Sequence, residues 1–253
     1  MAAKEEKLTA PLPEPPLAMV ERHIALEKPT GAGSLLRQMI LGGQDGLVNV
    51  LGLILGVASA TNSTSTVIIA GLAGTFAESI SMAAVAYASG RAAQDYYNAQ
   101  VEKEKKEIKD LPDIEREEVK LIYMKKGLRG KELDAVVNKI CSDEKVWLDV
   151  MMKEELGLTE SESIEPVKEG VIVGVSSLVG SLIPLVPFFF FPVSFSMPLA
   201  FVISVAVLFA AGALKAKWTI GDWLRSGSEM AAIGTLAAVS GYVIGTLLGA
   251  TVT

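Results

Sequence analysis

Cysteine and histidine are almost absent from this sequence of 253 residues, which has one of each. Cys141 has no second cysteine with which to form an internal disulfide, and His23 lies near the amino terminus. The sequence therefore gives no basis for a zinc site or a catalytic triad built on these residue types. Because no nucleophile, base and orienting group occur together, we expect that the chain is not an enzyme and carries no prosthetic group.

Aromatic residues are also scarce, at 6% of the chain, and no basic stripe is interleaved with them. The sequence therefore does not predict nucleic-acid binding. Four closely spaced prolines lie between residues 11 and 16, and the segment contains no apolar run typical of a signal peptide. We expect residues 1–35 to form a disordered cytoplasmic tail.

Apolar residues, in contrast, make up 50% of the chain, and its mean hydropathy is +0.40. Membrane-spanning helices need about 20 largely apolar residues. Segments near that length occupy residues 38–60, 67–90, 170–191, 198–213 with a short extension, and 230–250. Short uncharged stretches, "TNSTST" and "PVSFSMP", predict tight turns within the two hairpins. The expected fold is an all-α membrane protein with five transmembrane helices, the first two in residues 36–90 and the others in residues 169–253.

A polar insert separates the second and third apolar segments, at residues 91–168. It is strongly acidic, because 19 of the 29 acidic residues lie between Asp95 and Glu165. Glu and Lys recur at helical spacing and predict helices at about 113–126, 131–140 and 143–156, with Asp113 as an N-cap and "GLTESES" as the linker back to the membrane. We therefore expect an inserted three-helix cytoplasmic domain between transmembrane helices 2 and 3.

Lys and Arg residues predict the orientation, because cytoplasmic flanks are enriched in them. They precede the first and third apolar segments, follow the second, and lie between the fourth and fifth. The amino terminus and the insert should face the cytoplasm, and the carboxyl terminus the opposite side.

Two carboxyl groups interrupt the first two apolar segments, those of Asp45 and Glu78. Each is costly to bury in hydrocarbon, so each should face a protein or water-filled interior. Asn49 shares the helix face of Asp45, along with Gly52 and Gly56, and Met82 follows Glu78 by one helical turn on a face with Gly71 and Gly74. Oxygen and thioether ligands suit a divalent transition metal, and the carboxyls are able to exchange that metal for protons. Alternatively, these carboxyls only join helices by hydrogen bonds.

The insert carries a second set of candidate metal ligands. Glutamates at i,i+3 spacing, and methionines beside a glutamate, point from single helix faces in three places: Glu104 with Glu107, Glu115 with Glu118, and Met151 and Met152 with Glu155. Three packed helices would bring these groups together. The alternative is that these are ordinary solvated faces.

The segments "GGQDGLVNVLGLILGV", "ESISMAAVAYAS", "PDIEREEV" and "WLDVMMKEELGL" together resemble the vacuolar iron transporter family over about residues 36–250. The resemblance implies a homodimer in which the first two spans line the ion path at the two-fold axis. It further implies export of ferrous iron, and often manganese, from the cytoplasm by proton antiport. Asp45 would serve transport and proton coupling, Met82 would contact metal, and the insert ligands would be Glu104, Glu107, Glu115, Glu118, Met151, Met152 and Glu155.

One position departs from the plant members of that family, which carry the second-span carboxylate where this chain has Gly74. Glu78 lies one turn later, about 5.4 Å along the helix axis. Two alternatives to iron export stay open, a manganese-selective exporter and a membrane-anchored metal-buffering protein that does not transport. The resemblance fits either a cell membrane or a vacuolar or other endomembrane.

Overall fold

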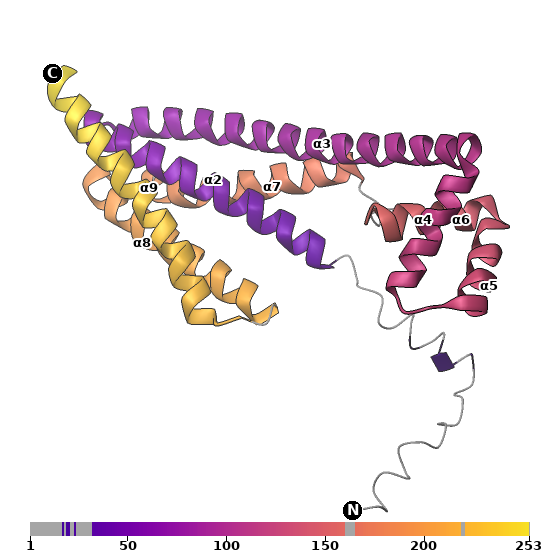
Figure 1. The fold of residues 1–253 in the computed structure, drawn as a ribbon. Coiled ribbons are helices and arrows are strands. Elements are labelled where there is room, and N and C mark those ends of the chain that lie inside the picture. Colours follow the sequence, from indigo (N-terminus) through magenta and orange to yellow (C-terminus); the bar gives the residue numbers. More distant parts are fainter. Residues whose placement is uncertain are drawn as a thin grey trace, which may run out of the picture. The chain divides into compact units, whose positions relative to one another are not determined.

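The computed structural model describes residues 17, 19, 20, 23, 32–159, 165–218 and 221–252. Residues 38–253 form one compact unit. Within the described ranges every regular element is a helix (Figure 1). The predicted tail over residues 1–35 lies almost entirely outside these ranges.

Five long apolar helices account for the five predicted spans, and that prediction is confirmed. They are α2 (Ala32–Thr61), α3 (Thr64–Asp110), α7 (Pro166–Leu185, continued by the 3₁₀ turn η4, Val186–Phe189), α8 (Val193–Trp218) and α9 (Trp223–Val252). Each has at least 20 residues, and at 1.5 Å per residue a helix of that length covers the hydrocarbon core of a bilayer.

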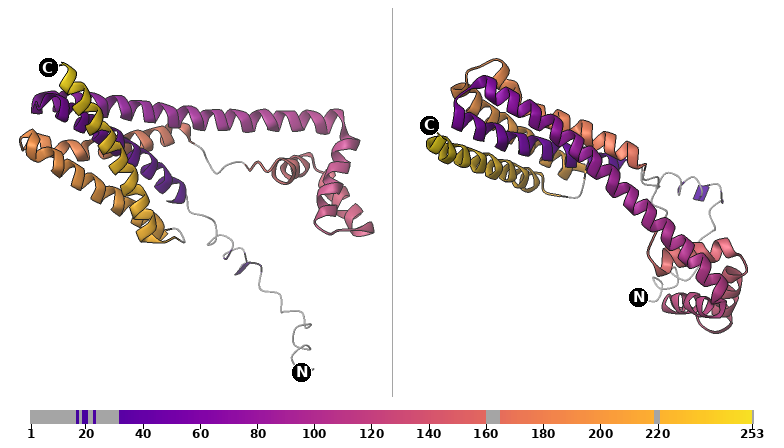
Figure 2. Two further views of the ribbon diagram at one scale, coloured as in Figure 1. Left: turned by 60° about the vertical axis from the view of Figure 1, so that its left-hand side comes forward. Right: turned by 90° about the horizontal axis from the view of Figure 1, so that it is seen from above.

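The second of these helices is much longer than a bilayer requires. α3 has 47 residues and runs without a break in both views of Figure 2, which corresponds to about 70 Å. Its apolar half begins after Ser63, whose side chain caps the helix by accepting from the Thr66 amide. Its polar half, from about residue 91, therefore extends beyond the hydrocarbon and begins the insert.

Glycines let the apolar helices approach one another closely. A Cβ atom on Gly46 would lie 2.4 Å from the Ser177 carbonyl oxygen of α7, and one on Gly241 would lie 2.0 Å from that of Gly52 on α2. α2 is therefore held between α7 and α9 by close backbone contacts that larger side chains would prevent. Gly71 gives a similar contact between α3 and Leu185.

The predicted turn "PVSFSMP" is wrong in extent, because α8 begins at Val193 and includes Pro198. Pro198 is the sixth residue of the helix, beyond its first turn, so α8 lacks the backbone hydrogen bond that an amide at position 198 would donate to the Ser194 carbonyl oxygen. The Ser196 hydroxyl donates to the carbonyl oxygens of Pro187 and Phe191, at 3.1 and 3.0 Å, and ties the new helix to the end of the previous one.

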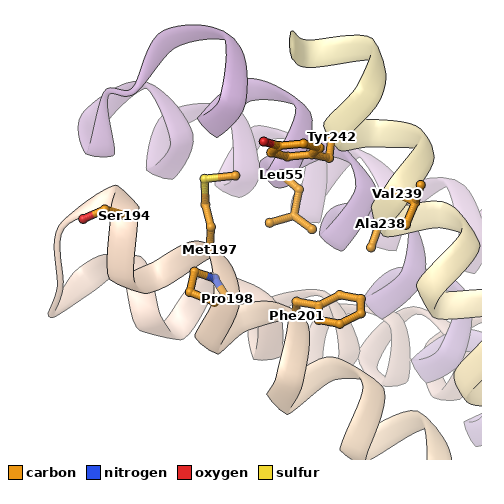
Figure 3. Close-up of a pocket in the computed structure, with 8 residues that line it drawn as sticks. All are labelled: Leu55, Ser194, Met197, Pro198, Phe201, Ala238, Val239 and Tyr242. Atoms are coloured by element: carbon orange, nitrogen blue, oxygen red, sulfur yellow. The ribbon is translucent and has the colours of Figure 1, made fainter.

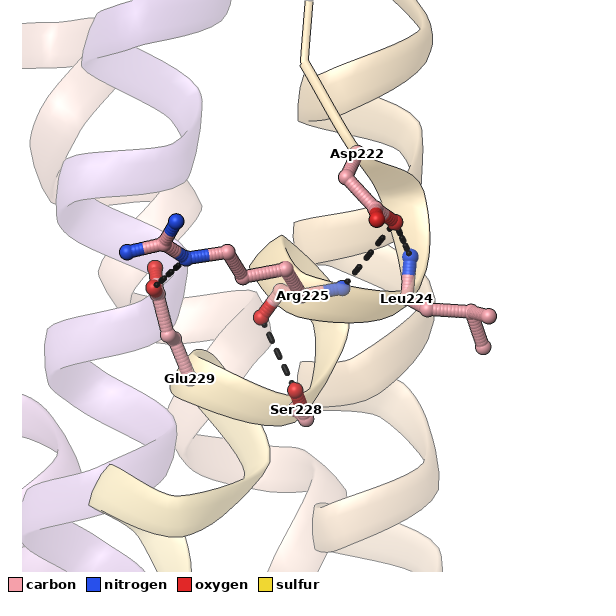
Figure 4. A network of polar contacts seen from close by, with 5 residues as sticks. All are labelled: Asp222, Leu224, Arg225, Ser228 and Glu229. Atoms are coloured by element: carbon pink, nitrogen blue, oxygen red, sulfur yellow. Dashed lines mark hydrogen bonds and ion pairs between the residues drawn. The ribbon is translucent and has the colours of Figure 1, made fainter.

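Polar contacts define the start of α9 (Figure 4). The Asp222 side chain accepts from the amides of Leu224 and Arg225, at 2.9 and 3.3 Å. One turn later the Arg225 Nε donates to Glu229 at 3.0 Å. This segment is more polar than the rest of α9, as expected of a helix end at a membrane surface.

The insert contains four short helical elements: α4 (Pro112–Lys125), α5 (Gly130–Cys141), α6 (Glu144–Val150) and the π-helical turn η3 (Met151–Glu155). Their bounds lie within two residues of the predicted helices. They enclose an apolar core that contains Val119, Leu133, Val137 and Trp147. The linker "GLTESES" lies partly outside the described residues.

The predicted N-cap at Asp113 is wrong. α4 begins at Pro112, so Asp113 lies inside the first turn, and Leu111 occupies the cap position without a side-chain hydrogen bond. Proline suits the first helical position because its φ angle is fixed and its missing amide hydrogen is not needed there. The side-chain cap of the insert is Asp143 instead, which accepts from the amides of Lys145 and Val146.

Candidate functional site

The two carboxyl groups of the first spans lie together. α2 positions Asp45 and Asn49 one turn apart, and α3 presents Glu78 to both. The Asn49 amide donates to Glu78 Oε1 at 3.0 Å, and the Asp45 carboxyl lies next to the Glu78 carboxyl. We call Asp45 and Glu78 the membrane carboxyl pair.

The other residues predicted to share a helix face with Asp45 or Glu78 have different neighbours. Gly52 approaches Ala237 of α9, and a Cβ atom on Gly74 would lie 2.6 Å from Leu53 Cδ2. A carboxylate at position 74 would therefore start at the level of Leu53 rather than beside Asp45. Met82 is half-buried, one turn from Glu78 toward the insert.

The five predicted glutamates of the insert also lie together, although they come from three segments of the chain. Glu104, Glu107 and Glu115 each offer an oxygen within 4.8 Å of the others, and so do Glu115, Glu118 and Glu155. We call these five residues the acidic cluster. Glu115 belongs to both groups, so the cluster is able to hold two neighbouring cations that share one carboxylate.

Two members of the acidic cluster are almost fully enclosed. Glu104 is 2% exposed and Glu115 is 4% exposed. The Glu115 Oε2 atom is buried and accepts no hydrogen bond from the described part of the chain. A buried carboxylate oxygen without a partner is costly, and a metal ion bound at this point would satisfy it.

Burial and like charge act in the same direction on the cluster. Burial, and then the neighbouring carboxylates of Glu118 and Glu104, raise the pKa of Glu115 to about 7. The pKa of Glu155 is raised too, first by burial and then by Glu118. The empty cluster therefore holds protons near neutral pH that a divalent cation would displace.

The two predicted methionine ligands lie in the π-helical turn η3, which ends at Glu155. Met151 is fully buried in the apolar core of the insert, and Met152 is 3% exposed. π-helical turns are rare and often occur at functional sites. Whether either thioether binds metal stays a prediction.

Sequence reasoning missed a basic residue at the cluster, Lys103. Its ammonium lies 3.1 Å from Glu107 Oε2 and 4.0 Å from Glu104 Oε1. It lies in a Glu/Lys-rich run that looks like any solvated helix face. Its i,i+4 relation to Glu107 was the available signal.

A cavity of about 460 Å³ between α2, α8 and α9 is a separate feature (Figure 3). It is lined mostly by apolar side chains, among them Leu55, Met197, Phe201 and Tyr242. It contains none of the predicted ion ligands, so we do not assign it to the ion path.

Five apolar helices, a carboxyl pair between two of them and an acidic cluster on an inserted helical segment define a polytopic membrane protein with two sets of candidate cation ligands. The chain belongs to the VIT family, whose family model matches residues 36–246. The resemblance noted from the sequence is thereby confirmed.

Named relatives span nearly the same length. Vacuolar iron transporter 1 of Arabidopsis thaliana is 31% identical, over 96% of this chain and 98% of its own. Vacuolar iron transporter 2 of Oryza sativa is 33% identical, over 85% and 88%. The vacuolar iron transporter of Plasmodium falciparum is 29% identical, over 84% and 82%. Members of this family are transporters, so the chain is an integral membrane protein and the expectation that it is not an enzyme is confirmed.

Proposed function

We propose that this chain exports ferrous iron from the cytoplasm in exchange for protons. The observation that carries the proposal is that the membrane carboxyl pair, Asp45 and Glu78, lies together between two apolar helices, with Asn49 hydrogen-bonded to Glu78. Two carboxyls inside apolar helices are costly unless they face a path for ions or water. The names of the relatives supply the metal.

The pair suggests how metal and proton movements are coupled. A divalent cation attracts both carboxylates in their ionised form, so its arrival expels the proton that the pair shares. When the cation leaves, two like charges remain close together in apolar surroundings, and this favours the return of a proton. Met82, one turn toward the insert, offers a thioether along the same path.

The insert supports the proposal as a cytoplasmic collecting domain. Its acidic cluster binds Fe²⁺ or Mn²⁺ before the ion enters the membrane, with Met151 and Met152 as further ligands. The Lys and Arg flanks support an orientation with the amino terminus and the insert in the cytoplasm and the carboxyl terminus on the other side. The names of the relatives favour a vacuolar or similar endomembrane.

We propose further that the working unit is a homodimer with its two-fold axis beside α2 and α3. Asn49 is exposed in the single chain although it lies within an apolar span. A second copy would cover Asn49 and enclose the ion path between the two subunits.

Flux measurements in proteoliposomes test this function. We expect Fe²⁺ uptake that accelerates when the lumen is more acidic than the medium and that alkalinises the lumen in proportion to the metal moved, because protons leave as metal enters. Glu78→Gln should abolish it, whereas Glu229→Gln, which removes an exposed carboxylate paired with Arg225, should not. Uptake that ignores the proton gradient would overturn the antiport.

The same assay separates the other two functions. Mn²⁺ flux that exceeds Fe²⁺ flux at equal concentration would identify a manganese exporter instead. If Asp45→Ala leaves cellular metal tolerance intact while Glu104→Ala abolishes it, the protein buffers metal without transporting it.

A further inference from the structure

Lys103 places a positive charge at the edge of the acidic cluster. It precedes Glu104 by one residue on α3 and Glu107 by four. Its ammonium is 3.1 Å from Glu107 Oε2 and 4.0 Å from Glu104 Oε1. Both carboxylates belong to one three-glutamate group, so the ammonium lies against the oxygens that a metal ion would use.

An ammonium and a divalent cation compete for such oxygens. The ammonium donates only to acceptors, and the carboxylate oxygens of Glu107 and Glu104 are its partners here. A cation bound by Glu104, Glu107 and Glu115 would take the same lone pairs and would repel the positive charge beside it. Metal binding therefore requires Lys103 to move away, and metal release lets it return.

We propose that Lys103 is a tethered competitor that weakens metal binding at the acidic cluster and speeds release of the ion toward the membrane path. This inference rests on the proposed collecting role of the insert. A domain that only stores metal benefits from the lowest possible Kd. A domain that passes metal on must also release the ion quickly. Lys103 supplies a replacement charge for the emptied site without any conformational change of the backbone.

A neighbouring ion pair separates this role from ordinary helix stabilisation. Lys105 lies 2.7 Å from Glu102 on the same helix, with both side chains largely exposed. Neither residue belongs to the acidic cluster. Exposed pairs of this kind contribute little to stability. If the Lys103–Glu107 ion pair only stabilised the helix in the same way, removal of the Lys103 charge would change the Kd for metal no more than removal of the Lys105 charge.

The experiment uses the full-length protein in detergent, with Trp218→Phe and Trp223→Phe so that Trp147 is the remaining tryptophan of the three. Trp147 lies in the core of the insert with Met151, so its quenching by paramagnetic Mn²⁺ reports binding there. Lys103→Gln should tighten the apparent Kd for Mn²⁺ by about threefold to tenfold at low salt, and the gain should shrink as NaCl is added. Release into a chelator, followed by stopped flow, should slow by a similar factor.

Two controls fix the interpretation. Lys105→Gln, which removes the same charge from the same helix, should leave the Kd near that of the parent. Lys103→Arg keeps the charge and should do the same. Equal Kd values for the Lys103→Gln and Lys105→Gln proteins would overturn the competitor role. Absence of saturable quenching in the parent, or quenching that Glu115→Gln leaves unchanged, would instead overturn the collecting role of the insert and this inference with it.

Discussion

At the scale of single residues, carboxyl groups do related work in two different surroundings. In the spans, Asp45 and Glu78 lie side by side, and Asn49 donates a hydrogen bond to Glu78. In the insert, Glu115 is buried among other carboxylates and has an oxygen without a partner. Both arrangements hold acidic groups close together and away from water, which is costly. A cation bound at each site, as proposed above, would offset that cost.

The position of Glu78 along α3 can be tested by moving the carboxylate. In a Glu78→Gly, Gly74→Glu protein the carboxylate moves by one turn along α3. It then starts near Leu53 and no longer beside Asp45 and Asn49. Loss of its charged hydrogen bonds should lower Fe²⁺ flux about tenfold or more. Gly74→Glu alone is the control, because it adds the same bulk and keeps Glu78. Parental flux from the double variant would show that the level of the carboxylate does not matter.

The raised pKa of Glu115 predicts how pH affects the metal-free insert. A carboxyl with a pKa near 4.5 when unfolded and about 7 when folded stabilises the folded state below 4.5, and this stabilisation is lost as pH rises through 7. In EDTA, the insert should therefore unfold more easily at pH 8 than at pH 5, by on the order of 1 to 3 kcal/mol. Thermal unfolding followed by Trp147 fluorescence measures this.

Glu115→Gln is the matched variant for that measurement. The amide is neutral at both pH values, so the insert should keep most of its stability at pH 8. A pH dependence that is equally large in the parent and in this variant would assign it to other groups.

Spacing in the sequence predicts which glutamates share a helix face, because residues three or four apart do so, and the family resemblance implies that the three faces meet. Spacing was not sufficient to predict what each meets. Asp45, Asn49 and Gly52 share a face in sequence, but the first two contact α3 and Gly52 contacts α9. α2 crosses α3 and α9 at different points along its length, so residues on one face of α2 contact different helices. Lys103 was missed for a different reason: its partners Glu104 and Glu107 lie on its own helix, but only the packing of α3 against α4 brings these glutamates next to Glu115.

At the scale of elements, helix starts were the least predictable feature. The sequence predicts an N-cap at Asp113 but none at Asp143, which is expected to lie at the first position of its helix. Only Asp143 caps, because Pro112 moves the start of α4 one residue earlier. Apolar length, in contrast, predicted all five spans, because the bilayer fixes how long a spanning helix must be.

This difference between the two aspartates is measurable. Asp143→Ala removes two accepted amide hydrogen bonds at the start of α6 and should destabilise the insert by about 1 kcal/mol. Asp113→Ala changes no cap and should cost less than half as much. Thermal unfolding in the single-tryptophan background compares them. An equal or larger loss from Asp113→Ala would contradict the helix start that the structure assigns.

At the scale of the whole molecule, α3 joins the two sets of cation ligands. Its apolar half carries Glu78 and Met82, and its polar half carries Glu104 and Glu107. Glu78 and Glu107 are 29 residues apart, which places them on nearly the same helix face at 100° per residue. One continuous helix therefore connects the proposed collecting site with the proposed path, and the two sites should affect different kinetic constants.

Substitutions at the two ends of α3 should separate those constants. Glu107→Gln weakens collection, so it should raise the Fe²⁺ concentration for half-maximal flux by about threefold to tenfold, while the maximal rate stays near that of the parent. Asp45→Ala acts on the path itself and should lower the rate at every concentration. Initial rates are measured in vesicles whose inserts face the medium.

Glu102→Gln is the control for Glu107→Gln, since Glu102 lies on the same helix, is paired with Lys105, and is outside the acidic cluster. It should leave both constants unchanged. The contrary outcome is that Glu107→Gln lowers the maximal rate as strongly as Asp45→Ala does. A saturating Fe²⁺ concentration would then not compensate for the loss of Glu107. The acidic cluster would then be an obligatory step of permeation, and metal would pass from carboxylate to carboxylate along α3 in every transport cycle.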